Sequence, residues 1–485
     1  MLFNSFEFLI FFPVVVTLYF AVPHRLRWAL LLCASYFFYM WWVPEYALLI
    51  VFSTVVDYIA SNRMGALKTK AERRPYMWVS VAVNLGLLFF FKYYNWVNEN
   101  VTAVVGRELL PLSHLLLPMG ISFYTLQTMS YTLDVYRGKL KPEKHFGVFA
   151  LYVSFFPQLV AGPIERAPNL LHQFYQKHKF EYARAANGLR LMAWGMFKKV
   201  VVADRLSMFT SSVYVEPQAQ DGLTLAIATV LFGFQLYCDF SGYSDIAIGT
   251  AQIIGFDLME NFKRPYFSKN IEELWGRRWH ISLTSWIKDY VYNPLAFMSR
   301  RASKARKHAN ILIIFLITGL WHGAAWRFVF WGMLNGVYVL AHVLTEKPRK
   351  KLREVTGLEN HPRVLAALGI AFTFFIFVVG SVPFLAKDMS DAWYILTHMF
   401  GGWSGAALSA FLANTGATIG KTNFALGLIG VAILFTVELF QERVRIREYL
   451  NTKPAWIRWS LTYGLILYIA LFGVFEYDEF IYFQF

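Results

Sequence analysis

The residue best suited to chemistry in this sequence is a histidine inside an apolar region. His322 lies in the tetrapeptide LWHG, at the end of an apolar run that begins at Ile311. Imidazole has an unperturbed pKa of about 6.5, so it can exchange a proton near neutral pH. An ionisable group held in hydrocarbon is costly and marks a candidate functional site. We therefore predict a catalytic His322. A structural histidine that donates to a backbone carbonyl is the alternative, and His342 in the same apolar region shows how weak one histidine is as a signal.

A second group of side chains that could do chemistry lies in the octapeptide WGRRWHIS, residues 275–282. This octapeptide contains Arg277, Arg278, Trp279 and His280. Arginine is well suited to phosphate, so we predict that the two arginines bind an anionic donor molecule arriving from the cytoplasm. Tryptophan and arginine also gather at membrane interfaces, and a plain interfacial anchor is the alternative.

Two carboxylates, Asp239 and Asp245, lie in an apolar neighbourhood six residues apart. This spacing does not place them on one face of a regular helix, so a paired-carboxylate mechanism is disfavoured. Structural roles are favoured, such as capping a broken helix or bonding to an arginine. The sequence contains no P-loop, HExxH, GxSxG or Cys-x-x-Cys motif, and it therefore gives no support for nucleotide, zinc or serine hydrolase chemistry or for a metal site.

The composition is that of an all-α, multi-pass membrane protein. Hydrophobic residues make up 57% of the 485 residues and charged residues 16%, against about 25% charged in soluble domains. We expect about 11 membrane segments in one domain, with N-terminal helices at 1–145, a catalytic region at 146–345 and C-terminal helices at 346–485. The clearest apolar runs are 79–91, 365–385, 424–440 and 456–475. No basic residue precedes the first apolar run, so no cleavable signal peptide is expected.

The basic residues predict an orientation in the membrane. Arg25 and Arg27 follow the first apolar segment, and further clusters lie at 63–74, 137–144, 300–307, 347–353 and 443–447. The positive-inside tendency places all of them in the cytoplasm, which leaves the N-terminus on the outer, periplasmic side. The same tendency explains the net charge of +15 through contact with anionic membrane lipids, and nucleic-acid binding is not expected.

Two regions do not read as simple membrane spans. Residues 309–345 begin and end beside cytoplasmic clusters, so they must form a tight hairpin or a re-entrant pair that breaks at Gly323, directly after His322. Residues 155–194 hold Pro157, Pro163 and Pro168 beside an apolar stretch. Irregular backbone at membrane depth is tolerated only inside protein or beside a wet cavity, so we predict a re-entrant or interfacial segment here.

Together these motifs resemble the membrane-bound O-acyltransferase (MBOAT) family, and specifically its bacterial branch typified by the alginate O-acetyltransferase membrane subunit. The resemblance covers nearly the whole chain. Each motif is weak alone, but the set is specific: FFPQLVAGPIER at 155–166, DFSGYSD at 239–245, NFKRPY at 261–266, WGRRWHIS at 275–282, GLWHGAAW at 319–326 and the ending YFQF at 482–485.

The resemblance implies a role for each candidate residue. His322 matches the essential catalytic histidine of the family, and His280 matches its second histidine. We expect Arg277, Arg278, Trp279, Trp321, Asp239 and Ser241 to bind substrate. The family resemblance also implies a ring of helices around a central tunnel in a bacterial cytoplasmic membrane. A cytoplasmic acyl donor and an extracytoplasmic acceptor would meet at His322, often with a periplasmic partner of the SGNH-hydrolase type.

The expected reaction moves an acetyl group from a thioester to a hydroxyl of an exported, alginate-like polysaccharide. Acetyl-coenzyme A is the expected donor, used as a substrate rather than a bound cofactor, although the sequence has no diagnostic coenzyme-A motif. Transfer of D-alanine toward teichoic acid and O-acetylation of peptidoglycan remain alternatives that use the same chemistry. A transporter or channel is an alternative of another class, although no inverted repeat is visible, and a scaffold of a secretion complex is a third.

Overall fold

The computed structural model describes residues 1–108, 110–297, 303–475 and 480–481. These residues form helices and no strand, which confirms the all-α prediction. Three features of the sequence lie outside the described residues: Arg300 and Arg301 of one basic cluster, the acidic segment 476–479, and the ending 482–485.

Seven helices in the described part of the chain are long and apolar enough to cross a membrane. They are Pro44–Ala66, Lys70–Val105, Gly222–Ile254, Trp326–Leu344, Pro362–Leu385, Lys421–Gln441 and Ala455–Phe472, and a shorter apolar helix covers Phe6–Ala21. Three of the four clearest apolar runs of the sequence coincide closely with helices of this set, and the fourth, 79–91, lies within the longer helix Lys70–Val105. The chain is therefore a multi-pass membrane protein, while the count of about 11 segments is not confirmed.

The chain divides into two compact units. Unit 1 comprises Met1–Met192 and Tyr243–Glu260, and unit 2 comprises Ala193–Gly242 and Asn261–Phe485. Two helices contribute to both units, namely α9 (Tyr182–Met196) and α11 (Gly222–Ile254). The expectation of a single domain with three successive regions remains a prediction.

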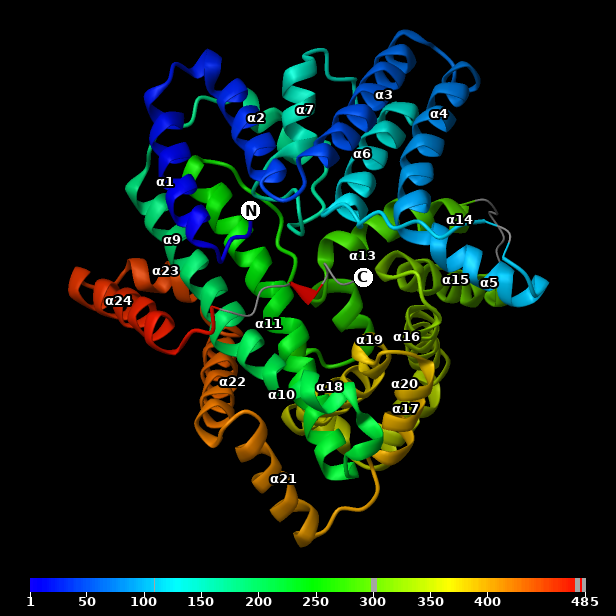
Figure 1. Cartoon of the computed structure of the whole chain (residues 1–485), viewed down its shortest axis with the longest axis vertical. Coiled ribbons are helices and arrows are strands. Elements are labelled where there is room, and N and C mark those ends of the chain that lie inside the picture. Colours follow the sequence, from blue (N-terminus) through cyan, green and yellow to red (C-terminus); the bar gives the residue numbers. More distant parts are fainter. Residues whose placement is uncertain (109, 298–302, 476–479, 482–485) are drawn as a thin grey trace. The chain divides into compact units, whose positions relative to one another are not determined.

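Unit 1 contains a bundle of α3, α4 and α6, and these helices lie side by side (Figure 1). Asp57 of α3 is fully buried there and accepts hydrogen bonds from Ser80 and Asn84 of α4, so a polar contact sets how these helices pack. The helices of unit 1 are α1 (Phe6–Ala21), α2 (His24–Met40), α3 (Ala47–Ala66), α4 (Lys70–Leu88), α5 (Tyr94–Val105), α6 (Ile121–Tyr136), α7 (Phe146–Ser154) and α8 (Ala167–Leu170).

Unit 2 holds every predicted site residue. Its helices are α10 (Asp204–Val215), α12 (Ile271–Glu273), α13 (Ile281–Ile287), α14 (Asn293–Phe297), α15 (Lys304–His322), α16 (Trp326–Leu344), α17 (Glu346–Val355), α18 (Pro362–Gly380), α19 (Val382–Leu385), α20 (Met389–His398), α21 (Gly405–Thr418), α22 (Lys421–Gln441), α23 (Ile446–Asn451) and α24 (Ala455–Phe472). A π-helical segment, Phe197–Ala203, joins α9 to α10.

Helices α15 and α16 form the predicted hairpin. Ser303 caps α15 by accepting from the Arg306 amide, and the helix ends at His322 because Gly323 is fully extended. A Cβ atom on Gly319 would lie 2.3 Å from the Phe328 carbonyl oxygen, and one on Gly332 would lie 2.4 Å from the Phe315 carbonyl oxygen. Only glycine lets the two backbones approach so closely. The predicted break after His322 is thus confirmed.

The region 155–194 is irregular at its start, as predicted. Helix α7 ends at Ser154, and α9 begins only at Tyr182. Between them lie the four-residue helix α8 and the 3₁₀ segment Leu171–Tyr175. Whether this segment re-enters the membrane stays a prediction.

Candidate functional site

His322 lies among aromatic rings in unit 2. It is the last residue of α15 and is 3% exposed. Its ring centroid is 4.9 Å from that of Trp321, 4.9 Å from that of Trp331 on α16, and 5.4 Å from that of Phe384 on α19. These rings exclude water and fix the imidazole at the end of a rigid hairpin.

His280 is held by a different kind of structure. It precedes α13 in the left-handed region, at φ 43° and ψ 54°, which non-glycine residues rarely adopt and which costs about 1–3 kcal/mol. Asn261 clamps the next two residues, because its carbonyl accepts from the Ile281 amide at 2.9 Å and its side chain accepts from the Ser282 hydroxyl at 2.8 Å. The Lys263 amide also donates to the Arg278 carbonyl at 2.9 Å. The motif 261–266 therefore positions the motif 275–282.

The structure brings the two predicted catalytic histidines together. Their ring centroids are 6.2 Å apart, and Trp321 lies 5.7 Å from His280. Phe240 of α11 covers the His280 ring at 4.7 Å. His280 lies outside the candidate spans, and burial lowers its pKa to about 3, so the ring is neutral at physiological pH. A neutral imidazole can still donate one hydrogen bond.

The two predicted phosphate-binding arginines differ in their surroundings. Arg277 is exposed. Arg278 forms ion pairs with Glu273 at 2.8 Å and with Glu442, the residue that follows α22, at 2.7 Å. Arg264 forms an ion pair with the same Glu442 at 2.6 Å. Trp279 is buried, with its ring centroid 4.6 Å from that of Phe377 on α18. The geometry gives Arg278 a structural task in addition to any contact with substrate.

Asp239 and Ser241 lie in a buried polar cluster that the sequence did not predict. Lys199 donates to Asp239 at 2.7 Å and pairs with Asp204 at 2.7 Å, while Lys198 donates to the Ser241 hydroxyl at 3.0 Å. The second carboxylate oxygen of Asp239 accepts from the Ile481 amide at 2.8 Å. The contacts are structural in kind, as favoured from the sequence, but the cation is a lysine rather than an arginine. Their predicted role in binding substrate remains a prediction.

The sequence did carry one usable signal for this cluster. Lys198 and Lys199 stand together in the otherwise apolar segment Phe197–Ala203, and the structure buries both. Lysine is almost never fully buried unless it is paired, so two such residues call for carboxylate or hydroxyl partners. Glu442, in contrast, had no local signal, and the motif at 261–266 did not indicate what Asn261 contacts.

The site therefore offers groups for proton transfer among buried aromatic side chains. It offers one imidazole at a helix end as base and a second, neutral imidazole as hydrogen-bond donor. Among the described residues, no group of three or more histidine, cysteine or carboxylate side chains is placed to hold a metal ion.

Comparisons with known proteins identify the family of this chain. The family model "MBOAT, membrane-bound O-acyltransferase family" matches residues 144–386, which include both histidines. The chain is 38% identical to "Probable alginate O-acetylase AlgI" of Pseudomonas aeruginosa, over 83% of this chain and 76% of that protein. It is 37% identical to the protein of the same name from Azotobacter vinelandii, over 83% and 79%.

A third relative, "Peptidoglycan O-acetyltransferase" of Helicobacter pylori, is 30% identical over 94% of this chain and 91% of its own length. The match to the family model and the similarity to these relatives lead to one conclusion. This chain belongs to the membrane-bound O-acyltransferase family and is an O-acyltransferase.

Proposed function

We propose that this protein moves an acetyl group from a cytoplasmic thioester, acetyl-coenzyme A, toward an exported alginate-like polysaccharide. The observation that carries the proposal is that the ring centroids of His322 and His280 lie 6.2 Å apart among buried aromatic side chains of unit 2. The similarity to proteins named alginate O-acetylase supports the choice of acetyl as the transferred group and of a polysaccharide as the acceptor.

In the proposed reaction, His322 takes the proton from the attacking hydroxyl. The hydroxyl oxygen forms a bond to the acetyl carbon, the carbon–sulfur bond breaks, and the proton passes from His322 to the departing thiolate. His280 donates a hydrogen bond to the oxyanion that develops on the acetyl oxygen. Because the His322 ring is 3% exposed, substrates reach it only when neighbouring aromatic side chains such as Trp321 move aside.

The donor would arrive at the basic side of unit 2. Arg277 is exposed and carries the predicted contact with the donor's phosphates, whereas Arg278 is engaged by two carboxylates. The acceptor would arrive from the other side of a bacterial cytoplasmic membrane, with the N-terminus on that periplasmic side. A periplasmic partner of the SGNH-hydrolase type would then pass the acetyl group on.

The decisive variant is His322→Ala. Loss of the base is expected to lower acetyl transfer by about 10²- to 10⁴-fold, because positioned proton transfer contributes that much. The measurement is polymer acetylation in cells, together with the abundance of the protein in the membrane. His342→Ala is the matched control, since His342 lies in the same hairpin, half-buried, at the far end of α16. Wild-type acetylation by His322→Ala at normal abundance would refute the proposal.

Peptidoglycan is the second candidate acceptor. The relative named peptidoglycan O-acetyltransferase aligns with 94% of this chain, more than the alginate-named relatives do. Mass spectrometry of the exported polysaccharide and of muropeptides from the same cells separates the two. If acetate is lost from muropeptides alone in His322→Ala cells, the acceptor is peptidoglycan.

A further inference from the structure

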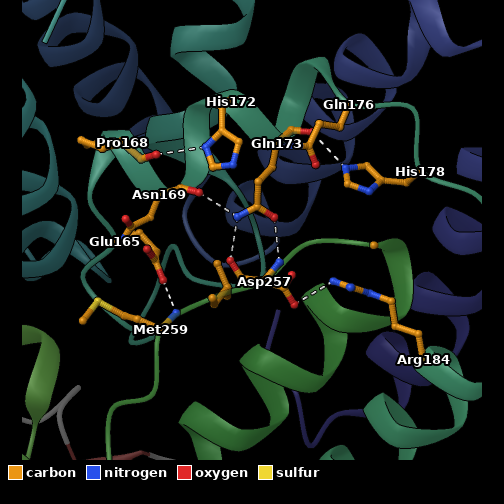
Figure 2. Close-up of a pocket in the computed structure, with 12 residues that line it drawn as sticks. Glu165, Pro168, Asn169, His172, Gln173, Gln176, His178, Arg184, Asp257 and Met259 are labelled. Carbon is orange, nitrogen blue, oxygen red and sulfur yellow. Dashed lines mark hydrogen bonds and ion pairs between the residues drawn. The ribbon is translucent and has the colours of Figure 1, made fainter.

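Unit 1 contains a cavity of about 590 Å³, and the polar groups at its centre are bonded to one another (Figure 2). The Gln173 side chain donates to the Asn169 carbonyl at 2.8 Å and to the Asp257 carbonyl at 2.9 Å. Arg184 pairs with the Asp257 carboxylate at 2.9 Å, and His178 contacts the Gln173 carbonyl at 2.9 Å. These contacts join the segment around α8 to the residues that follow α11, which is a structural role.

Arg327 of unit 2 is a charged residue in an unfavourable place. It is the second residue of α16, a candidate membrane span. A cation near the N-terminus of a helix is disfavoured by the helix dipole. A charged side chain within a membrane segment is also costly and by default marks a functional region. The contacts of the Arg327 side chain therefore have to offset both costs.

The Arg327 side chain binds the end of helix α19. Its Nη1 atom donates to the Phe384 carbonyl at 2.7 Å and to the Ala386 carbonyl at 2.8 Å. Both of these residues are buried, and buried carbonyls at the end of a helix need partners from outside that helix. The guanidinium also lies over the Phe328 ring, 4.4 Å from its centroid. Arg327 thus ties α19 to the hairpin of α15 and α16.

The residue that Arg327 holds by its backbone covers His322 with its side chain. The Phe384 ring centroid is 5.4 Å from that of His322, 5.5 Å from that of Trp331 and 5.2 Å from that of Phe328. Phe384 is therefore packed between the end of α15 and the first turns of α16. Movement of its backbone would shift a ring that bounds the imidazole.

We propose that Arg327 is a positioning residue for acyl transfer. By holding the backbone of Phe384, it keeps the Phe384 ring against the imidazole of His322 and fixes the direction in which the imidazole points. This inference rests on the proposed role of His322 as the base. A base has to lie within hydrogen-bond reach of the proton that it takes. Loosening of Phe384 should therefore impair the chemical step more than the binding of substrates.

The first test is the kinetics of acetyl transfer by the full-length protein in membranes. Arg327→Ala should lower kcat by about 10- to 100-fold, because a misplacement of about 1 Å can cost as much. The KM for the donor should stay within about twofold of the wild-type value. Arg327→Lys keeps a charged donor for the two carbonyls and should retain clearly more activity than the alanine variant.

Arg349→Ala is the matched control. Arg349 donates to the His342 carbonyl at 2.6 Å, at the other end of α16. Its loss removes a comparable bond between an arginine and a helix carbonyl without touching the surroundings of His322. Its kcat should equal that of the wild type.

The second test does not depend on activity. Diethyl pyrocarbonate modifies accessible imidazoles, and mass spectrometry of the peptide that contains His322 measures the rate. The ring is 3% exposed in the wild type, so modification should be slow. Arg327→Ala and Phe384→Ala should each speed it several-fold, whereas Arg349→Ala should not. Combining the first two changes should add little, because both act through the Phe384 ring.

The outcomes separate the role of Arg327 from the proposed function. A variant Arg327→Ala that is less stable but has wild-type kcat and wild-type modification of His322 would overturn the positioning role. Equal effects of Arg327→Ala and Arg349→Ala would do the same. If Arg327→Ala does not accumulate in membranes, Arg327→Gln, which keeps one amide donor, should show the same changes in smaller measure. Absence of acetyl transfer by the wild type would instead refute the proposed function, and the modification rates would still test the hold on Phe384.

Discussion

The two histidines of unit 2 are positioned by opposite means. His322 ends a regular helix in a hairpin whose two backbones touch through Gly319 and Gly332. His280 lies in a strained, left-handed turn that a distant segment holds through Asn261. The hairpin obtains its rigidity from local, repeated contacts. The turn depends on a few long-range hydrogen bonds, so single substitutions should disturb it more selectively.

Among the tests of this comparison, the largest effect is expected when the His280 side chain is removed and its backbone conformation is kept. His280→Ala should lower acetyl transfer by about 10²- to 10³-fold, the usual loss for one oxyanion donor. His280→Asn keeps a hydrogen-bond donor, and asparagine tolerates the left-handed region. It should therefore fold as the wild type does and retain more activity than the alanine variant. Equal activities in the two variants, measured as kcat at equal melting temperature, would show that the donor is irrelevant.

The hairpin is tested by filling its closest backbone contact. Gly319→Val places a branched side chain against the Phe328 carbonyl oxygen, and it should destabilise the protein by about 1–3 kcal/mol or more. Gly464 of α24 has open space where a Cβ would lie, so Gly464→Val is the control for the helical backbone. Thermal unfolding in detergent measures both. Equal melting temperatures would mean that α15 and α16 are not held by glycine contact.

The clamp on His280 is tested by a double-mutant cycle. Asn261→Ala leaves the Ser282 hydroxyl without its acceptor and should cost about 1–3 kcal/mol of stability. It should also lower kcat, because the turn that carries His280 loosens. Ser282→Ala alone should cost less. If the two losses are simply additive in the double variant, the hydrogen bond between these side chains does not hold the turn.

The smallest effect is expected at the partly exposed ion pairs behind the turn. Glu442→Gln removes the partner of both Arg264 and Arg278 and should cost no more than about 1 kcal/mol, because water screens such pairs. Added salt should shrink the difference from the wild type. Glu448, in an exposed pair with Arg445, provides the control variant Glu448→Gln. A large loss of activity in Glu442→Gln without loss of stability would instead place this cluster in the donor site.

The same contrast explains what could be predicted from the sequence. The hairpin was predictable because an apolar run, a glycine and flanking basic residues all lie close together in the chain. The contacts around His280 were not predictable. The motif at 261–266 does not show that Asn261 binds Ser282, and Glu442 pairs with Arg278 from 164 residues away. The roles of Asp239 and Ser241 were similarly obscured, since their lysine partners lie on another helix. The family motifs included the segments around His280 and His322, but they did not show which side chains of these segments contact one another.

The π-helical segment Phe197–Ala203 limits the insertion and deletion of residues at this point in the chain. Its seven residues aim Lys198 at Ser241 and Lys199 at Asp239 from neighbouring positions. A π-helical turn contains one residue more than the α-helical turn it replaces. Deleting one residue here would restore an ordinary helical turn and leave the flanking helices in register, but it would change the directions in which residues 198 and 199 point. At least one of the two lysines would then lose its partner. Insertions and deletions should therefore be rare in this stretch, although the backbone itself could accommodate them.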